Sequence, residues 1–523
     1  MRNNAYDDLS EEIGLTDTEE EKKKKKIKKN DNEWLSKAKL RNRINAEWKG
    51  KDYGKTVFLF VLHALIVGVL FAAGVFLSEG SISAFVTYFT TESTLRNFVY
   101  VMISVFFLFA MLYVFFFFEL NSFLKDTKNI LMLFSIVEIS IILCYLVGRY
   151  LNIYARPLAF CGLMVLLLVN RRSAIMTNFA FCLLVFMLDI LTNGYGRAAY
   201  TSIIIGLTTG VLAIYLVSNV SSRIKVFTMG FVISIPIIEC VLCLELKNAS
   251  DILPLVGFGF TSGMLSVVLM MAILPFYENI FNVVTNYRLS EITNHKFPPI
   301  KRLINEANGT FNHCLTVSTF AESCATAIGE NALLARACAY YHDIGKLKQP
   351  EYFSENQKDY NPHSELSPEL STDIIRSHAH DGALFIERYR LPKILADVCE
   401  QHHGTMVIRY FYAEASKYTE EKLSERDFSY PGPTPQTKIA AIIMICDGCE
   451  AAVRSLSDRS RSSIDAMVKA IIDERLIKYR QFDNCDITMK ELDIIHDTIT
   501  QCIGGVYHDR VKYPDADKIP GRR

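Results

Sequence analysis

Long apolar stretches separated by short polar connections fill the first half of the chain, and this pattern predicts membrane-spanning helices. About 20 consecutive apolar residues make a helix long enough to cross the hydrocarbon core of a bilayer. Eight stretches approach or reach this length, and no globular domain is inserted between them. We expect spans at residues 56–77, 97–118, 127–148, 152–170, 174–192, 198–219, 224–246 and 252–275.

Basic residues near the ends of these stretches predict their orientation, because Lys and Arg collect on the cytoplasmic side. Residues 1–55 are polar and include the run EEEKKKKKIKK, which predicts a disordered cytoplasmic tail. Eight spans place three further basic connections in the cytoplasm, at Lys125 and Lys128, at Arg171 and Arg172, and at Arg223 and Lys225. An even number also returns the chain to the cytoplasm after Phe276, whereas seven spans would place the second half outside. The charges therefore favour eight spans in a multi-pass protein of the cell membrane.

From about residue 276 the composition becomes that of a soluble domain, and the apolar residues recur at helical spacing. The clearest helical segments are TVSTFAESCATAIGE, NALLARACAYYHD, LSTDIIRSHAHDGALFIERY, PKILADVCEQHH and TKIAAIIMICDGCEAAVRSL. Gly329, Gly345 and Gly404 stand where such helices should end. We expect an all-α protein, in which a polytopic transmembrane region precedes a cytoplasmic all-helical domain. The expected parts are a tail at 1–55, the spans at 56–275, a helical connector at 276–308, the soluble domain at 309–510 and a tail at 511–523.

Composition narrows the possible functions. The 56 basic and 56 acidic residues give no net charge, which argues against a partner that is a nucleic-acid polymer. The 13 cysteines do not form the pattern of a secreted disulfide framework, and the CxxC spacing of Cys446 and Cys449 has no second pair to complete a zinc site. Glu138, Asp189 and Glu239 lie within the spans without an evident cationic partner, and isolated acids of this kind do not make a transporter.

Histidines and aspartates recur at the predicted helix ends of the soluble domain, where eight of the 11 histidines fall between residues 295 and 403. Any single histidine there is explained by an interaction with a helix C-terminus. Asp447 stands within the apolar helix AAIIMICDGCEAA, where it needs a partner, either a metal ion or Arg454 seven residues later. Taken together, the set suits divalent iron, manganese or zinc. The candidate ligands are His313, His342, Asp343, His378, His402, His403 and Asp447.

Seven ligands are too many for one tetrahedral ion, so we expect two metal ions with Asp343 bridging them. Iron or manganese is favoured, because the donors are nitrogen and oxygen without a thiolate. A pair of ions polarises a phosphoryl oxygen and lowers the pKa of a bridging water, whose hydroxide attacks phosphorus in line. Lys346 follows Asp343 by three residues and could hold a phosphate oxygen, the alternative being a surface lysine. The predicted catalytic residues are Asp343 and Lys346.

The ordered set His…HD…His…HH…Asp resembles the HD superfamily of metal-dependent phosphohydrolases. The segments EANGTFNHCLTV, LLARACAYYHDIGKLKQPEYFSENQ, NPHSELSPELS, IIRSHAHDGA, LPKILADVCEQHHGT and ICDGCEAAVRS resemble more closely the PgpH-type, seven-transmembrane-receptor HD family. Members of that family are cyclic-di-AMP phosphodiesterases of bacterial membranes. The resemblance covers residues 276 to about 510 closely, and the preceding spans by architecture.

This resemblance implies the same seven metal ligands and hydrolysis of cyclic-di-AMP to linear pApA at a membrane. It also implies that Asn361, His363, Lys346 and Arg454 contact the phosphates or bases of the substrate, and that His380 is not a ligand. In this family a large extracytoplasmic domain usually follows the first span, whereas here only SEGSISAFVTYFTTESTLR lies there. The implied partners are cyclic-di-AMP and the lipid bilayer, and a second copy of the chain is a candidate for a homodimer.

Other classes of HD enzyme carry residues that can be checked against this chain. Cyclic-di-GMP hydrolases of the HD-GYP type carry Gly-Tyr-Pro after the double histidine, where this chain has QHHGTMVIRYFY. Hydrolases of (p)ppGpp carry acidic residues after the HD pair, where this chain has HDIGK. A non-catalytic receptor of cyclic dinucleotides is a further alternative, although a module that only binds could lose ligands at little cost.

Overall fold

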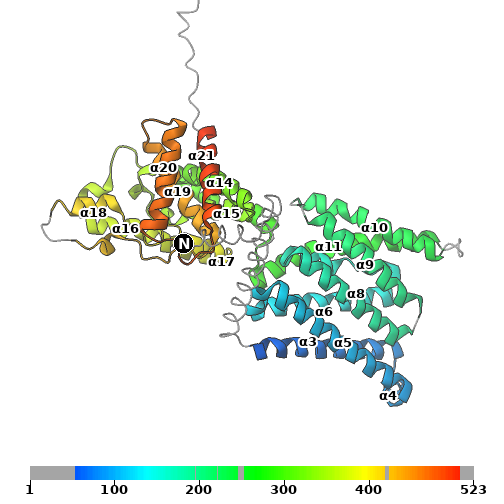
Figure 1. The fold of residues 1–523 in the computed structure, drawn as a ribbon. Helices are drawn as coiled ribbons and strands as arrows, with labels where there is room; N and C mark the ends of the chain where they lie inside the picture. Colours follow the sequence, from blue (N-terminus) through cyan, green and yellow to red (C-terminus); the bar gives the residue numbers. More distant parts are fainter. Residues whose placement is uncertain are drawn as a thin grey trace, which may run out of the picture. The chain divides into compact units, whose positions relative to one another are not determined.

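The computed structural model describes residues 53–194, 196–218, 220, 222–245, 252–418 and 423–506. These residues form helices and turns, with a single isolated bridge between Val407 and Ser429, so the predicted all-α fold is confirmed (Figure 1). Apart from 53–55, the two predicted tails lie outside the described residues. The chain forms two compact units, the first through Cys161 with Arg172–Val211 and Cys240–Phe258, and the second from the remaining segments.

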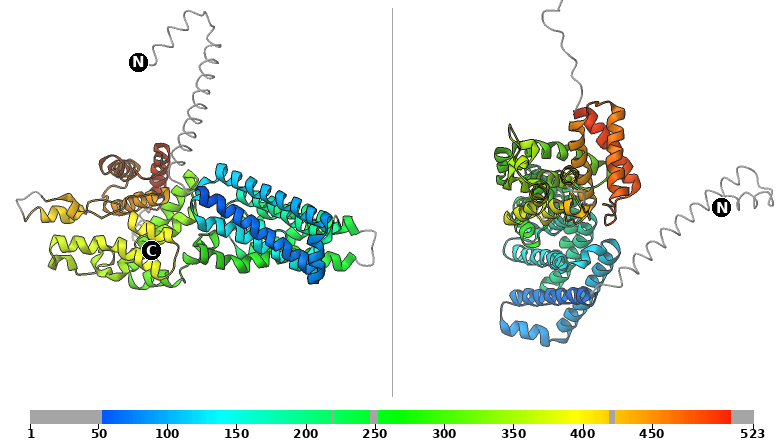
Figure 2. Two further views of the ribbon diagram at one scale, coloured as in Figure 1. Left: turned by 90° about the horizontal axis from the view of Figure 1, so that it is seen from below. Right: turned by 90° about the vertical axis from the view of Figure 1, so that its left-hand side faces the viewer.

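Seven described helices are long and apolar enough to cross a membrane. They are α3 (Tyr53–Glu79), α5 (Glu92–Glu119), α6 (Thr127–Tyr150), α8 (Arg171–Asn193), α9 (Arg197–Val217), α10 (Arg223–Glu245) and α11 (Ile252–Phe281). In the first unit, α3 and α5 pack side by side, joined by the short helix α4 (Ile82–Thr90) (Figures 1 and 2). The chain is therefore a multi-pass membrane protein.

The expectation of a regular spanning helix at residues 152–170 is wrong. This stretch contains a 3-10 turn at Ile153–Ala155 and the nine-residue helix α7 (Phe160–Leu168). Nine residues of α-helix measure about 14 Å, roughly half of the hydrocarbon thickness. The break falls at Arg156 and Pro157, because proline excludes the preceding residue from helical geometry. Among the described residues, seven helices are thus long enough to span by themselves, and the eighth expected span is broken.

Two of the intramembrane acids have partners that the sequence did not reveal. Arg156 donates to both oxygens of Asp189, at 2.6 and 2.8 Å, and both side chains are buried. Gly148 leaves room for the guanidinium, since a Cβ there would lie 2.1 Å from Arg156 Nε. His63 Nδ1 lies 2.7 Å from a carboxylate oxygen of Glu138. The prediction that Asp189 lacks a cationic partner is therefore wrong, and Glu138 has a polar partner in His63.

Among the described residues, ten α-helices follow the last span. They are α12 (Asn286–Ile292), α13 (Pro298–Glu306), α14 (Asn308–Ile328), α15 (Ala332–Tyr341), α16 (Pro368–Arg388), α17 (Lys393–Gln401), α18 (Arg409–Ala415), α19 (Lys438–Ser455), α20 (Arg461–Asp473) and α21 (Met489–Val506). Nine of these helices share one core, in which Phe320, Cys338 and Ile443 are fully or almost fully buried, whereas Phe411 and Ala415 of α18 pack with Phe428 in a small separate cluster. The core is continuous across α14, α15 and α19, which fixes the relative positions of the side chains that these helices carry.

The predicted helix-ending glycines have different roles. Gly329 ends α14 in the left-handed conformation, with φ of 78°, as predicted. Gly404 also has positive φ, at 52°, and follows α17. Gly345 does not end α15, which stops at Tyr341; it lies inside the next 3-10 turn, η4 (Ile344–Lys348). There it allows η4 to touch the backbone of α16, because a Cβ would lie 2.0 Å from the His378 oxygen.

Candidate metal centre

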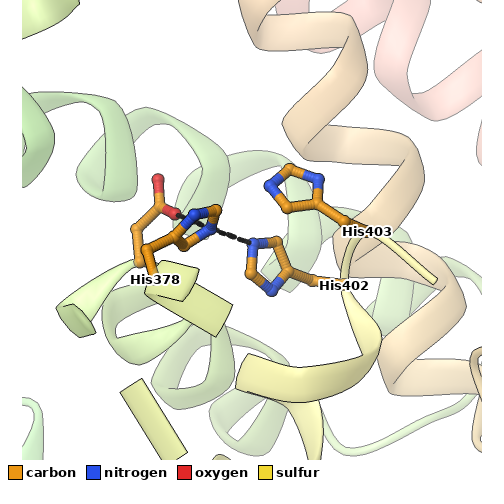
Figure 3. A group of neighbouring side chains, drawn as sticks. His378, His402 and His403 are labelled. Atoms are coloured by element: carbon orange, nitrogen blue, oxygen red, sulfur yellow. Dashed lines mark hydrogen bonds and ion pairs between the residues drawn. The ribbon is translucent and has the colours of Figure 1, made fainter. Parts of the chain in front are cut away.

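The structure brings all seven predicted ligands together. His313 lies on α14, His342 and Asp343 join α15 to η4, and the remaining side chains come from α16, the end of α17 and α19. Their ligand atoms fall into two groups whose members lie within 4.8 Å of one another. One group is Asp343, His378, His402 and His403, and the other is His313, His342 and Asp447. Figure 3 shows the rings of His378, His402 and His403 converging.

Asp343 faces both groups, one with each carboxylate oxygen. Its Oδ1 lies 3.3 Å from His378 Nε2 and 3.6 Å from His402 Nε2. Its Oδ2 lies 3.5 Å from His313 Nε2 and 3.3 Å from His342 Nε2. A carboxylate in this position can be shared between two cations, as the sequence predicted for Asp343.

Asp447 also lies between the groups. Its Oδ1 is 3.0 Å from His313 Nε2 and 3.9 Å from His342 Nε2, and its Oδ2 is 3.7 Å from His403 Nδ1. The alternative pairing with Arg454 is wrong, because Arg454 contacts Glu450 instead. The helical register of α19 explains this: Glu450 is four residues before Arg454, whereas Asp447 is seven residues before it.

Backbone carbonyls orient three of the histidine rings. His342 Nδ1 lies 2.7 Å from Ala339 O, His378 Nδ1 lies 2.6 Å from Ile375 O, and His402 Nδ1 lies 2.7 Å from Cys399 O. A carbonyl only accepts, so each Nδ1 must carry the proton. In the neutral form of each ring, Nε2 then carries the lone pair and faces the other candidate ligands, the form in which imidazole binds a metal.

The residues fit a pair of divalent cations. His342 Nε2 and Asp343 Oδ1 are buried and have no hydrogen-bond partner among the described residues. The Nε2 atoms of His378 and His402 are 3.3 Å apart, so their lone pairs need a cation or a proton between them (Figure 3). Unpaired buried polar atoms cost about 1–3 kcal/mol each, which a bound cation would offset. Nitrogen and oxygen donors of this kind suit iron, manganese or zinc.

Burial and neighbouring charges set the protonation of these groups. Burial lowers the pKa of His402 and His403, which keeps both imidazoles neutral. Burial alone would raise the pKa of Asp343, but Lys346 and His342 hold it well below its usual value. For His313, burial opposes protonation, but hydrogen bonds to Asp447 and Glu450 raise its pKa to about 10. A cation would replace the proton on His313 Nε2, so metal binding there releases a proton.

Lys346 is not the surface lysine that the sequence left as an alternative. Its side chain is 12% exposed, and Nζ lies 2.7 Å from Asp343 Oδ2 and 2.8 Å from Glu355 Oε1. Nζ also lies 4.9 Å from the centroid of the Phe353 ring. Lys346 is therefore held beside the bridging carboxylate, where it can reach an anionic ligand.

A cleft of about 590 Å³ opens onto the two groups. Lys346 and Arg454, two of the residues predicted to contact substrate, line it. Asn361 and His363 do not line it, so the structure gives no support to their predicted contacts. Asn361 caps the 3-10 turn η7 (Pro362–Glu365) by accepting from His363 N, and His363 Nε2 lies 2.9 Å from Tyr352 O. His380, which was not expected to be a ligand, is exposed and pairs with Glu400.

The cleft is also lined by residues that sequence reasoning missed, among them Phe353, Glu355, Tyr430 and Glu450. The Tyr430 ring stacks on that of His403 with centroids 4.2 Å apart. Glu450 had a detectable signal, because it is a second acid on an apolar helix, one turn after Asp447. The other three lie on loops or short turns, which have no periodicity from which to predict a side-chain direction.

Comparisons with known proteins agree with this arrangement. A family model described as "7TM receptor with intracellular HD hydrolase" matches residues 95–285, and one described as "HD domain" matches residues 310–452. A Bacillus subtilis (strain 168) relative named cyclic-di-AMP phosphodiesterase PgpH is 37% identical over 409 residues, 76% of this chain and 57% of its own length. A Listeria monocytogenes relative of the same name is 35% identical over 403 residues, 75% of this chain and 55% of its own length.

The chain therefore spans a little more than half the length of these curated relatives. A crystal structure of the L. monocytogenes phosphodiesterase PgpH HD domain in complex with cyclic-di-AMP is 45% identical. It covers 41% of this chain and 100% of its own, with a TM-score of 0.39. Family models thus account for both the apolar helices and the histidine-rich domain. Residues 95–285 thus match the family of seven-transmembrane receptors with an intracellular HD hydrolase, and residues 310–452 match the HD domain.

Proposed function

We propose that this chain is a membrane-bound phosphodiesterase that hydrolyses cyclic-di-AMP to linear pApA with two divalent ions. The observation that carries the proposal is the position of Asp343, whose two oxygens face two different pairs of histidines. One carboxylate with a histidine pair at each oxygen is suited to a centre that holds two cations. The substrate is proposed from the names of the two relatives and from the motifs that the chain shares with that family.

His378, His402, His403 and Asp343 would hold one ion, and His313, His342 and Asp447 would hold the other, with Asp343 shared. Iron or manganese is proposed because the donors are imidazole and carboxylate. When bound, two such ions stabilise the attacking and leaving oxygens of a phosphoryl transfer.

The chain's own cations would bind and orient the phosphates. Lys346 lies beside Asp343, and Arg454 lies farther along the same cleft with its side chain 44% exposed. Both can donate to phosphate oxygens, and Arg454 can do so with two parallel N–H groups. The cleft volume of about 590 Å³ falls within the range of small-molecule sites.

We also propose that the N-terminus and the HD domain both face the cytoplasm. Residues 95–285 match a family model with seven transmembrane segments. Of the seven described helices of spanning length, six fall within this range. A seventh crossing there requires the broken segment Ile153–Leu168, and α3 then makes eight. Residues 154–165 are all buried, and irregular backbone is tolerated at membrane depth only when protein covers it. Reporter fusions at the two ends should report the same side; opposite sides would refute this orientation.

The decisive experiment uses the full chain in lipid nanodiscs, loaded with Mn²⁺ or Fe²⁺ under anaerobic conditions. It is incubated separately with cyclic-di-AMP, cyclic-di-GMP and ppGpp, beside His342→Ala and Asp343→Ala. We expect linear pApA from cyclic-di-AMP, and its loss in both variants and in chelator. If only cyclic-di-GMP or only ppGpp is hydrolysed, that nucleotide is the substrate and the proposal of cyclic-di-AMP is wrong. Binding of cyclic-di-AMP without turnover of any substrate would establish a receptor instead of an enzyme.

A further inference from the structure

Glu450 is a buried carboxylate that touches the metal centre through a histidine. It lies on α19, one turn after Asp447, and its side chain is 1% exposed. Its Oε2 lies 2.6 Å from His313 Nδ1. Its Oε1 accepts from Arg454, at 2.7 Å from Nε and 2.5 Å from a terminal nitrogen. Glu450 therefore lies between a candidate ligand and a cation at the rim of the cleft.

His313 differs from His342, His378 and His402 in what holds its Nδ1. For His342, His378 and His402 that atom bonds a backbone carbonyl three residues earlier on the same helix. For His313 the partner is the side chain of Glu450, 137 residues away in sequence. The three backbone bonds come with the local helix geometry. The orientation of His313 instead depends on one replaceable side chain.

The carboxylate also decides which ring nitrogen is free. Where Glu450 Oε2 accepts from the Nδ1–H of His313, Nε2 is the nitrogen that a cation can reach. Nε2 is then left to face Asp447 Oδ1 at 3.0 Å and Asp343 Oδ2 at 3.5 Å. A carboxylate behind a ligand histidine fixes its tautomer and makes the other nitrogen a stronger donor to a metal ion.

Arg454 explains how the carboxylate can be buried. Removing a carboxylate from water costs several kcal/mol unless a cation compensates it. The two-pronged contact of Arg454 supplies that charge, while 44% of the Arg454 side chain stays exposed. His313, Glu450 and Arg454 thus form a continuous chain of hydrogen bonds from the metal centre to the cleft rim.

We propose that Glu450 is a positioning residue that fixes His313 with Nδ1 protonated and Nε2 available to one of the two ions, while Arg454 balances its charge. The inference rests on the proposed metal centre. It assigns to Arg454 a structural role besides contact with substrate. Loss of Glu450 should therefore weaken the ion held by His313, His342 and Asp447 more than the ion held by His378, His402 and His403.

The test measures Mn²⁺ binding to the metal-free full chain in nanodiscs by titration calorimetry, with free Mn²⁺ followed by electron paramagnetic resonance. For Glu450→Ala we expect one of two Mn²⁺ to bind about 10- to 100-fold more weakly, the usual effect of losing such a partner. Glu450→Gln should lose less, since its amide oxygen still accepts from Nδ1–H. Glu322→Ala is the control, because Glu322 is on the same helix as His313 and pairs with Arg336 away from the cleft. It should bind as the wild type does.

Glu450→Ala leaves Arg454 unpaired, so the double change Glu450→Ala/Arg454→Ala is measured beside it as a variant that removes both charges. Helicity and thermal unfolding without metal identify the variants that fold. A folded variant lacking Glu450 that binds both Mn²⁺ with wild-type affinity would overturn the proposal, as would an equal loss in Glu322→Ala. The measurement involves no substrate, so a wild type that fails to hydrolyse cyclic-di-AMP leaves it interpretable.

Discussion

Replacing Gly345 by alanine should disable the metal centre without changing any candidate ligand. A Cβ at this position would lie 2.0 Å from the backbone oxygen of His378 and 2.5 Å from the backbone nitrogen of Gly382. Ordinary contact begins at 3.4 Å, so the first pair is short by about 1.4 Å. Both atoms belong to the backbone of α16, and no side-chain rotation can relieve the overlap. The turn η4 and helix α16 would have to move apart.

This separation acts directly on the site. Asp343 precedes Gly345 by two residues, and His378 itself carries the backbone oxygen that would be displaced. Functional groups must be held to within about 0.5 Å, and a misplacement of about 1 Å can cost about 100-fold in rate. We expect Gly345→Ala to lose at least about 100-fold in the proposed hydrolysis of cyclic-di-AMP and to bind Mn²⁺ more weakly. Overpacking should also lower the free energy of unfolding by about 1–3 kcal/mol.

The assay compares turnover, Mn²⁺ affinity and thermal unfolding of the full chain in nanodiscs. Gly504→Ala is the matched control, because Gly504 lies on α21 and a Cβ there would meet nothing within 4 Å. Alanine in a helix should stabilise it by about 0.5–1 kcal/mol and leave activity unchanged. Wild-type turnover and Mn²⁺ affinity in Gly345→Ala would refute the reasoning, since they would show that η4 and α16 can separate without disturbing the centre.

Three further predictions concern charges. Lys346→Met should reduce turnover about 100-fold while Mn²⁺ still binds, because it removes a donor to the phosphate. Lys348 is exposed, so Lys348→Met should leave turnover unchanged. Equal losses of turnover in the two variants would contradict this prediction. Burial alone would raise the pKa of Glu355, but the charge of Lys346 has the larger effect and holds the pKa below its usual 4.5. The stabilisation from Glu355 is therefore complete above pH 4.5 and is lost as the pH falls through the lowered pKa. Thermal unfolding in chelator should show that the wild type is more stable than Glu355→Gln at neutral pH and that this difference vanishes in acid. A difference that persists in acid would be inconsistent with this sign. Arg156→Ala or Asp189→Ala alone should lower the free energy of unfolding by about 3–5 kcal/mol, because each leaves a buried charge without its partner. The double variant should lose less than the sum of the two, measured by unfolding in detergent. Strictly additive losses would argue against an interaction between the two side chains.

The sequence was sufficient to predict most of the helices and the convergence of the candidate ligands. Apolar stretches of spanning length are visible without tertiary information, and histidines at the ends of amphipathic helices are typical of a shared centre. The segment at 152–170 misled because composition alone does not show where an apolar run breaks. Arg156 and Pro157 were the available signal, since a charged residue followed by proline is unfavourable within a spanning helix.

The substrate contacts were harder to predict, because a segment that resembles the family does not reveal the direction of each side chain in it. Asn361 and Arg454 both lie in such segments, yet only Arg454 lines the cleft. Asn361 is committed to the local turn through its bond to His363 N, a bond that an Asn-Pro-His sequence favours by itself. Glu355 lay in a matched segment too, but nothing in its spacing connects it to Lys346. Such partners depend on how loops fold over the core.

The turn η4 concentrates several functions in few residues, which explains why it is sensitive to change. Asp343 begins it with a carboxylate that faces both histidine groups, Gly345 allows it to touch α16, and Lys346 returns from it to neutralise Asp343. Each of these requires the same backbone path, because a 3-10 turn has about three residues in each turn and brings residues 343 and 346 to one side. A change that moves this backbone therefore alters the bridging carboxylate, its counter-charge and the distance to His378 at once. Substitutions at Asp343, Gly345 and Lys346 should act together rather than additively, in contrast to changes at Lys348, the exposed last residue of the same turn.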